Sequence, residues 1–131
     1  MAARDWTAPW QQVAAGKPAL ARLWAQAVTP LGPAGTVRAE VELQLRPHLE
    51  TLHDAVLADP PDNGAAERVG AALVGRGLDD PAALAATIAV LGDRLLAELG
   101  LDEATFAGPL HTLLGSLAAG YARALVAASG N

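Results

Sequence analysis

The sequence PLHTLLGSLAAGYARALVAAS, residues 109–129, is the strongest indication of the fold class in this chain. It consists largely of leucine, alanine and glycine, of which leucine and alanine are strong helix formers, and Arg123 is its one charged residue. Apolar residues recur at helical spacing and predict one core-facing side: Leu110, Leu114, Leu117, Tyr121 and Leu125. We therefore expect a long final helix from near Pro109, which continues into a downstream domain of a longer protein.

The rest of the chain has the same helical character. Apolar residues make up 52% of the 131 residues and are mostly alanine and leucine, while isoleucine occurs once, at Ile88. The valines do not alternate with polar residues, so no strands are expected. A chain of this length corresponds to one domain. The sequence predicts an all-α fold, an irregular antiparallel bundle of about five helices.

The first half divides at proline and glycine. Thr7 is expected to cap a short helix that ends at Gly16, and Pro18 is expected to start the next one, so that residues 1–17 form an N-terminal arm and residues 18–131 a single helical domain. The segment TPLGPAGT, residues 29–36, predicts a loop whose Thr36 caps a long helix. The predicted core face of that helix is Val41, Leu45, Leu49, Leu52 and Val56.

Charges and a proline mark the outer side of this long helix. Glu42, Arg46 and Glu50 are spaced four apart and can pair along it. Pro47 removes a hydrogen bond inside the pattern, so we expect a kink near residues 43–47. The segment ADPPDNG, residues 58–64, ends the helix.

Three more helical segments follow. The first covers residues 65–76 and ends at Gly77; the second is capped by Asp80, with Pro81 in its first turn. Its predicted core face is Leu84, Ile88, Leu91, Leu95 and Leu99. Asp102 caps the last region, and Gly108-Pro109 is expected to interrupt it.

Composition and motifs exclude several classes of function. Nine basic and fourteen acidic residues give a net charge of −5, which disfavours binding to a nucleic-acid backbone. The chain lacks cysteine, an HExxH zinc motif, a phosphate loop and a nucleophile triad; His48 and His53 are five apart, which does not suit a helical metal pair. No apolar run is long enough to span a membrane, and MAARDWTAPW does not resemble a signal peptide. We expect a cytoplasmic non-enzyme without cofactor or metal.

Small residues on the final helix form the candidate functional site. His111, Gly115, Ala118 and Ala122 share a second face, and Ala82, Ala86 and Ala89 form a similar face on the preceding helix. Three interpretations are open: the two faces pack on each other, the final helix forms a seam between subunits of a homodimer, or a small-molecule pocket lies beside His111, with Trp24 and Tyr121 as neighbours.

All three tryptophans lie in the first 24 residues. Trp24 is expected in the core. Trp6 and Trp10 either dock the N-terminal arm onto the bundle or stay exposed as a partner or ligand surface.

Three segments together resemble a known family. They are ALARLWAQAV (19–28), DDPAALAATIAVLGDRLLAEL (79–99) and LLGSLAAGYARAL (113–125). Their order and spacing resemble the helical N-terminal region of actinobacterial cyclic-di-GMP signalling proteins, which carry GGDEF and often EAL domains. TPLGPAGT departs from the aromatic stretch usual after the first helix of that family. No GGDEF or EAL motif is present, so a cyclase activity cannot reside in these residues.

The resemblance implies a non-catalytic sensory or dimerisation module with signalling domains downstream in the same chain. The alternative function is small-molecule binding, because Ala/Leu-rich bundles also resemble the ligand-binding half of TetR-type regulators. A connected apolar cavity near Trp24, Tyr121 and His111 would favour the alternative, and a filled core with an exposed helix face would favour dimerisation.

Overall fold

The computed structural model describes residues 9–130, and this range contains helices and no strand. The helices are α1 (Pro9–Val28), α2 (Arg38–Leu57), α3 (Asn63–Gly75), α4 (Pro81–Glu98) and α5 (Glu103–Ser129), with one 3-10 turn, η2 (Thr29–Leu31), after α1. The predicted all-α bundle of about five helices is confirmed. The predictions for Thr7 and Trp6, and for the side chain of Trp10, lie outside the described residues.

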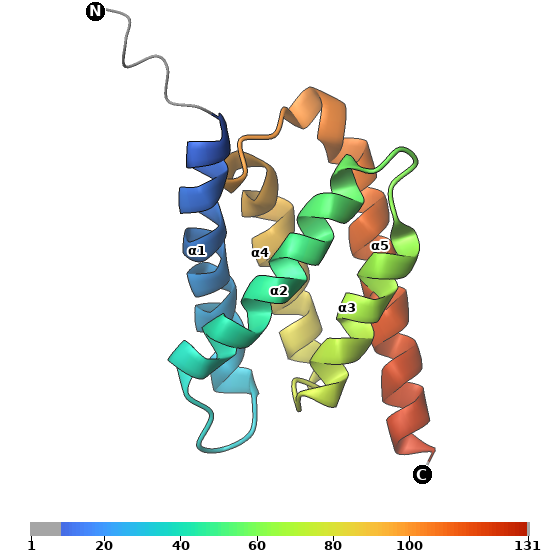
Figure 1. Ribbon diagram of the computed structural model, residues 1–131. Coiled ribbons are helices and arrows are strands. Elements are labelled where there is room, and N and C mark those ends of the chain that lie inside the picture. Colours follow the sequence, from blue (N-terminus) through green and yellow to red (C-terminus); the bar gives the residue numbers. More distant parts are fainter. Residues whose placement is uncertain (1–8, 131) are drawn as a thin grey trace, which may run out of the picture.

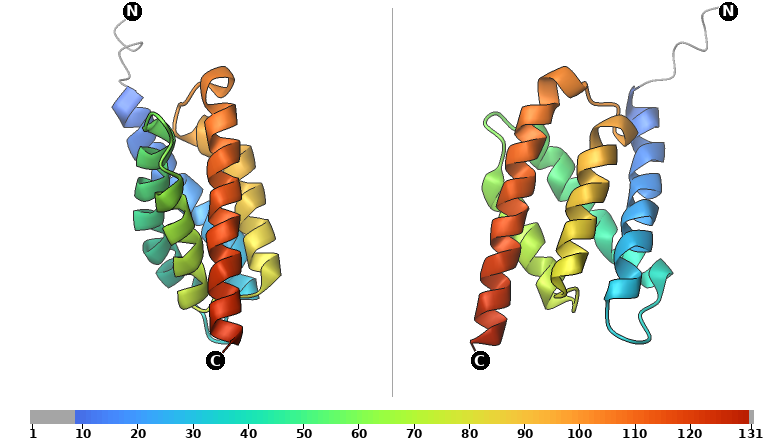
Figure 2. Two further views of the ribbon diagram at one scale, coloured as in Figure 1. Left: turned by 90° about the vertical axis from the view of Figure 1, so that its right-hand side faces the viewer. Right: turned by 180° about the vertical axis from the view of Figure 1, so that it is seen from behind.

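The helices form two layers. Helices α2 and α3 make one layer, and α1, α4 and α5 make the other (Figure 1; Figure 2). Consecutive helices run antiparallel, whereas α3 and α5 run in the same direction (Figure 1). The closest packing in the bundle is between α3 and α5, and α1 packs on both α2 and α4. One aliphatic core lies between the layers.

Helix α1 is continuous where a break between two helices was predicted. It runs through Gly16 and Pro18, and residues 9–17 form its first turns. The predicted stop at Gly16 is wrong, because this glycine serves a tertiary contact: a Cβ there would overlap the carbonyl group of Glu98 at the end of α4. Glycine thus allows the two helices to approach backbone to backbone.

Helix α5 is also continuous across a predicted break. Gly108 and Pro109 lie inside it, and the helix begins at Glu103. A proline removes only one backbone hydrogen bond, and a helix of 27 residues retains the others. The Asp102 side chain caps the first turn as predicted, by accepting a hydrogen bond from the Thr105 amide at 2.9 Å.

Helix α2 confirms its predicted core face but not its predicted cap. All five predicted core residues are buried. The N-cap is Val37, which makes no side-chain cap bond, and the Thr36 hydroxyl instead donates to the carbonyl of Pro33 within the loop. Pro47 lies inside one continuous helix, and the kink there stays a prediction.

Helix α4 is capped as predicted but rotated from its predicted orientation. Asp80 accepts from the Ala82 amide, and Pro81 opens the helix. Leu91, Leu95 and Leu99 are buried, whereas Leu84 and Ile88 are only half-buried. Ala83 and Thr87 are the residues that face the core in the first two turns. The rotation places a polar side chain, Thr87, in the interior.

Candidate functional site

Trp24 is a core residue that joins two helices. Its side chain is fully buried, and its indole Nε1 donates a 2.8 Å hydrogen bond to the Thr87 hydroxyl of α4. This contact satisfies the one polar atom of the indole inside the core. Trp24 therefore holds α1 against α4 and is not part of a surface site.

Tyr121 is likewise committed to the interior. Its hydroxyl lies 2.5 Å from the carbonyl oxygen of Leu78 and 2.9 Å from that of Asp80, and donates to this pair. Burial, followed by the negative charges of Asp79 and Asp80, raises the pKa of Tyr121 to about 12. The phenol stays protonated near neutrality and ties the α3–α4 joint to α5.

Two glycines that sequence reasoning missed set the contact between α3 and α5. A Cβ on Gly70 would overlap the Leu117 carbonyl, and a Cβ on Gly120 would overlap the Glu67 carbonyl. The two backbones therefore touch at this crossing. On α5, the small residue that allows this close contact is therefore Gly120, which does not belong to the predicted face.

The predicted small-residue face lies on the surface. His111, Gly115 and Ala122 are exposed and Ala118 is half-buried. A Cβ added at Gly115 would meet nothing within 4 Å. The six predicted site residues therefore do not come together, because Trp24 and Tyr121 are in the core and the other four line the outside of α5.

The corresponding face of α4 is exposed as well. Ala82 and Ala89 are exposed and Ala86 is half-buried. Helices α4 and α5 lie side by side in one layer, and both present their outer faces to the viewer in the right panel of Figure 2. The interpretation in which the two small faces cover each other is wrong, because most residues of both faces are exposed.

The outer surface of α5 is apolar and almost free of charge. Between Glu103 and Ser129 the helix has one charged residue after its first, Arg123. Val126 is 72% exposed, the most exposed of the large hydrophobic residues whose burial the structure describes. A helix face in contact with water usually carries charged side chains, so this face is unusual for a surface helix. We call the exposed stripe of His111, Gly115, Ala119, Ala122 and Val126 the outer face of α5.

Four hollows among the described residues lie elsewhere. One lies along the 29–36 loop, one between α3 and α5 beside Arg68 and Arg123, one between α1 and α4 beside Leu23, and one between α2 and the α3–α4 joint. None of these four is lined by Trp24, Tyr121 or His111. The pocket of the third interpretation, beside those residues, is not among these four.

Titratable groups form no metal-binding cluster in the described part of the chain. Residues 9–130 contain no group of three histidine or acidic side chains that could hold a metal ion. Burial, with a smaller effect of Arg76, lowers the pKa of His48; burial, with a smaller effect of Lys17, lowers that of His53. Both imidazoles are therefore neutral near pH 7.

None of the described helices is long and apolar enough to cross a bilayer.

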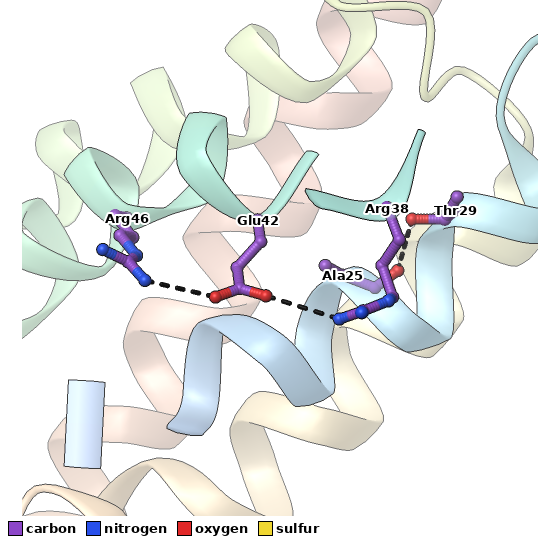
Figure 3. A network of polar contacts seen from close by, with 5 residues as sticks. All are labelled: Ala25, Thr29, Arg38, Glu42 and Arg46. Carbon is purple, nitrogen blue, oxygen red and sulfur yellow. Dashed lines mark hydrogen bonds and ion pairs between the residues drawn. The ribbon is translucent and has the colours of Figure 1, made fainter. Parts of the chain in front are cut away.

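Surface ion pairs follow helical spacing. Glu42 accepts from Arg38 at 3.4 Å and from Arg46 at 3.2 Å, a three-residue ladder along α2 (Figure 3). Glu50 does not extend this ladder as predicted, because it pairs at 2.6 Å with Lys17 of α1. These exposed pairs explain how α2 is solvated and do not form a ligand site.

Comparisons of the chain with protein-family models, with curated proteins and with solved structures found no match.

Proposed function

We propose that this chain is a non-catalytic sensory and dimerisation module of a bacterial signal-transduction protein, active in the cytoplasm. In this proposal, two copies associate through the outer face of α5. The observation that carries it is the exposure of an apolar, nearly uncharged helix face whose glycine and alanines leave a flat surface. Exposed apolar surfaces of this kind mark sites of association.

A second copy is the partner that suits this face. Closed two-fold dimers are the commonest oligomers of soluble proteins, and their interfaces require a surface that complements itself. A stripe of small apolar residues meets this requirement, because no charge opposes its own copy. Gly115 and Ala122 would allow two α5 helices to approach closely, and Val126 would be covered by the partner.

The resemblance to the N-terminal region of GGDEF and EAL proteins supports a role for the module in passing a signal to other domains. In a longer protein, α5 would lead toward downstream signalling domains. Pairing of two α5 helices would then set the spacing between two effector domains, and a shift of the pair would change their activity.

The alternative resembling the ligand half of a TetR-type regulator has less support. It requires an internal cavity beside Trp24 and Tyr121, yet both side chains are packed in the core with their polar atoms hydrogen-bonded. We therefore favour assembly over internal ligand binding.

The variant Gly115→Arg tests the proposal. A Cβ added at Gly115 meets no atom within 4 Å and the position is exposed, so folding should be retained, but the arginine would place an unpaired charge in the interface. The matched control is Gly75→Arg, since Gly75 also has nothing within 4 Å of an added Cβ and lies at the end of α3.

The expected result in sedimentation equilibrium is a dimer for the wild type and for Gly75→Arg, and a monomer with unchanged helicity for Gly115→Arg. A Gly115→Arg variant that dimerises as tightly as the wild type would contradict the assignment of the interface.

A further inference from the structure

The hollow between α2 and the α3–α4 joint differs from the other three in being the most enclosed and the most polar. Its walls come from three parts of the chain: the loop before α2, the first two turns of α2, and the residues that follow α3. The side chains that line it include Thr36, Glu40, Val41, Gln44, Arg76 and Leu78. Val41 and Leu78 are buried, so polar groups surround an apolar floor.

Two opposite charges face this hollow without pairing. Neither the Glu40 carboxylate nor the Arg76 guanidinium takes part in a hydrogen bond or ion pair within residues 9–130. Each charge complements the helix end on which it lies, since Glu40 is in the first turn of α2 and Arg76 caps α3. Their positions at helix ends do not, however, explain why both charged side chains line the same hollow.

The neighbouring histidine adds no second positive charge. Glu40, Gln44 and His48 are four residues apart and follow one line along α2. Burial and the charge of Arg76 lower the pKa of His48, so its imidazole is neutral near pH 7. Its buried Nε2 has no hydrogen-bond partner in the described residues. The hollow is therefore lined by one cationic group, that of Arg76, one anionic group, that of Glu40, and the side-chain amide of Gln44.

The walls of the hollow are held by tertiary contacts. The Leu78 carbonyl accepts from the Tyr121 hydroxyl of α5 at 2.5 Å. On the other side, the loop rests on the joint, because a Cβ added at Gly77 would lie 3.0 Å from Pro33 and one at Gly32 would lie 3.2 Å from the Leu78 side chain. A site whose walls are already fixed loses little entropy when a ligand binds.

We propose that this hollow binds a small zwitterion, a molecule with one carboxylate and one ammonium group. Arg76 would bind the carboxylate and Glu40 the ammonium, with Gln44 as a further hydrogen-bonding group. The volume of about 180 Å³ sets the size. It corresponds to the space of about six waters, or roughly six non-hydrogen atoms, and is below the roughly 300 Å³ at which pockets for drug-sized ligands begin. Amino acids of about the size of alanine carry both charges and fit this volume. This inference does not depend on the dimer proposed above.

The test is a titration of the full chain, followed by amide NMR shifts, with glycine, L-alanine, β-alanine and γ-aminobutyrate. Acetate and methylamine are the single-charge controls. The expected result is a saturable shift of amides in residues 33–44 and 76–78 with at least one zwitterion, and weaker binding of both controls. Equal binding of acetate, or no saturable shift with any of the four zwitterions at tens of millimolar, would overturn the proposal.

Two variants separate this site from a general surface effect. Arg76→Gln and Glu40→Gln are each expected to weaken binding roughly 10- to 100-fold, the effect of one charge-assisted hydrogen bond. Arg68→Gln is the matched control, because Arg68 lies on α3, the helix that Arg76 caps, but lines a different hollow. Both Arg76 and Glu40 are exposed, so the variants should fold, and their thermal melting checks this. An Arg76→Gln variant that binds as tightly as Arg68→Gln would overturn the assignment.

Discussion

The indole Nε1 of Trp24 donates a 2.8 Å hydrogen bond to the hydroxyl of Thr87, between two buried side chains on α1 and α4. Thr87 is a buried polar residue within the described core, and its hydroxyl accepts the hydrogen bond that the buried indole of Trp24 requires. The packing of α1 on α4 therefore depends on a specific pair as well as on apolar burial.

Removal of this hydroxyl should weaken the fold. Thr87→Val keeps the shape of the side chain but leaves the indole N–H buried without a partner, which costs about 1–3 kcal/mol of unfolding free energy. Urea denaturation measures the loss. Thr112→Val is the control, because the Thr112 hydroxyl is exposed and bonds only to the carbonyl of its own helix. Equal stability of the two variants would show that the Trp24–Thr87 bond contributes nothing.

Because the backbones of α3 and α5 are in contact, we expect alanine at position 120 of α5 to give a less stable fold than glycine. Gly120→Ala forces a Cβ into the Glu67 carbonyl and should destabilise the fold by about 1–3 kcal/mol, despite the better helix propensity of alanine. Gly92→Ala, at an exposed position inside α4 where an added Cβ meets only the Leu114 side chain at an ordinary 3.6 Å, should instead stabilise the fold by about 0.5–1 kcal/mol. Thermal denaturation distinguishes the two, and a Gly120→Ala variant as stable as the wild type would contradict the close crossing.

Tyr121 predicts a loss of stability in alkaline solution. Its pKa is raised from 10 to about 12 in the folded chain, so between these values the unfolded chain loses the phenolic proton while the folded chain keeps it. Stability is therefore full below pH 10 and falls as the pH rises toward 12, by roughly 3 kcal/mol in total. Tyr121→Phe should flatten this part of the pH profile relative to the wild type. An identical alkaline slope in both proteins would show that Tyr121 is not the group responsible.

The histidines of α2 predict a loss of stability in mild acid. The pKa of His48 and that of His53 are lowered from 6.5, so below pH 6.5 the unfolded chain binds protons that the folded chain does not. Stability is present above pH 6.5 and is lost as the pH falls through the folded pKa values. His48→Gln and His53→Gln, singly and together, should reduce the slope of unfolding free energy between pH 6.5 and 5. A double variant with the wild-type slope would refute this assignment.

Local chemistry allowed much of the fold to be predicted from the sequence. Asp80 and Asp102 cap helices as expected, because the cap bond joins a side chain to an amide two or three residues later. The core face of α2 was also predicted, since its apolar period is regular over the whole helix.

The errors arose where a residue serves a distant partner. Gly16 looks like a helix stop in the sequence, but it makes room for the carbonyl of Glu98. Gly70 and Gly120 are 50 positions apart, and nothing local indicates that their helices cross. Thr87 resembles a surface residue until Trp24 is placed beside it.

The candidate site was predictable in composition but not in position. The small residues of α5 were identified from the sequence, which left open whether they are exposed or packed against the preceding helix. Trp24 and Tyr121 were predicted as core residues and also as neighbours of the alternative pocket, and in the structure each has its polar atom bonded inside the core.

Sedimentation equilibrium of the wild-type chain over a wide range of concentrations is the decisive measurement of dimerisation through α5. If the outer face of α5 joins two copies, the data should fit a reversible monomer–dimer equilibrium, with a mass that approaches twice 13.3 kDa as the concentration rises. A mass that stays at that of one chain at the highest concentration would contradict the proposal that this face is a dimer interface.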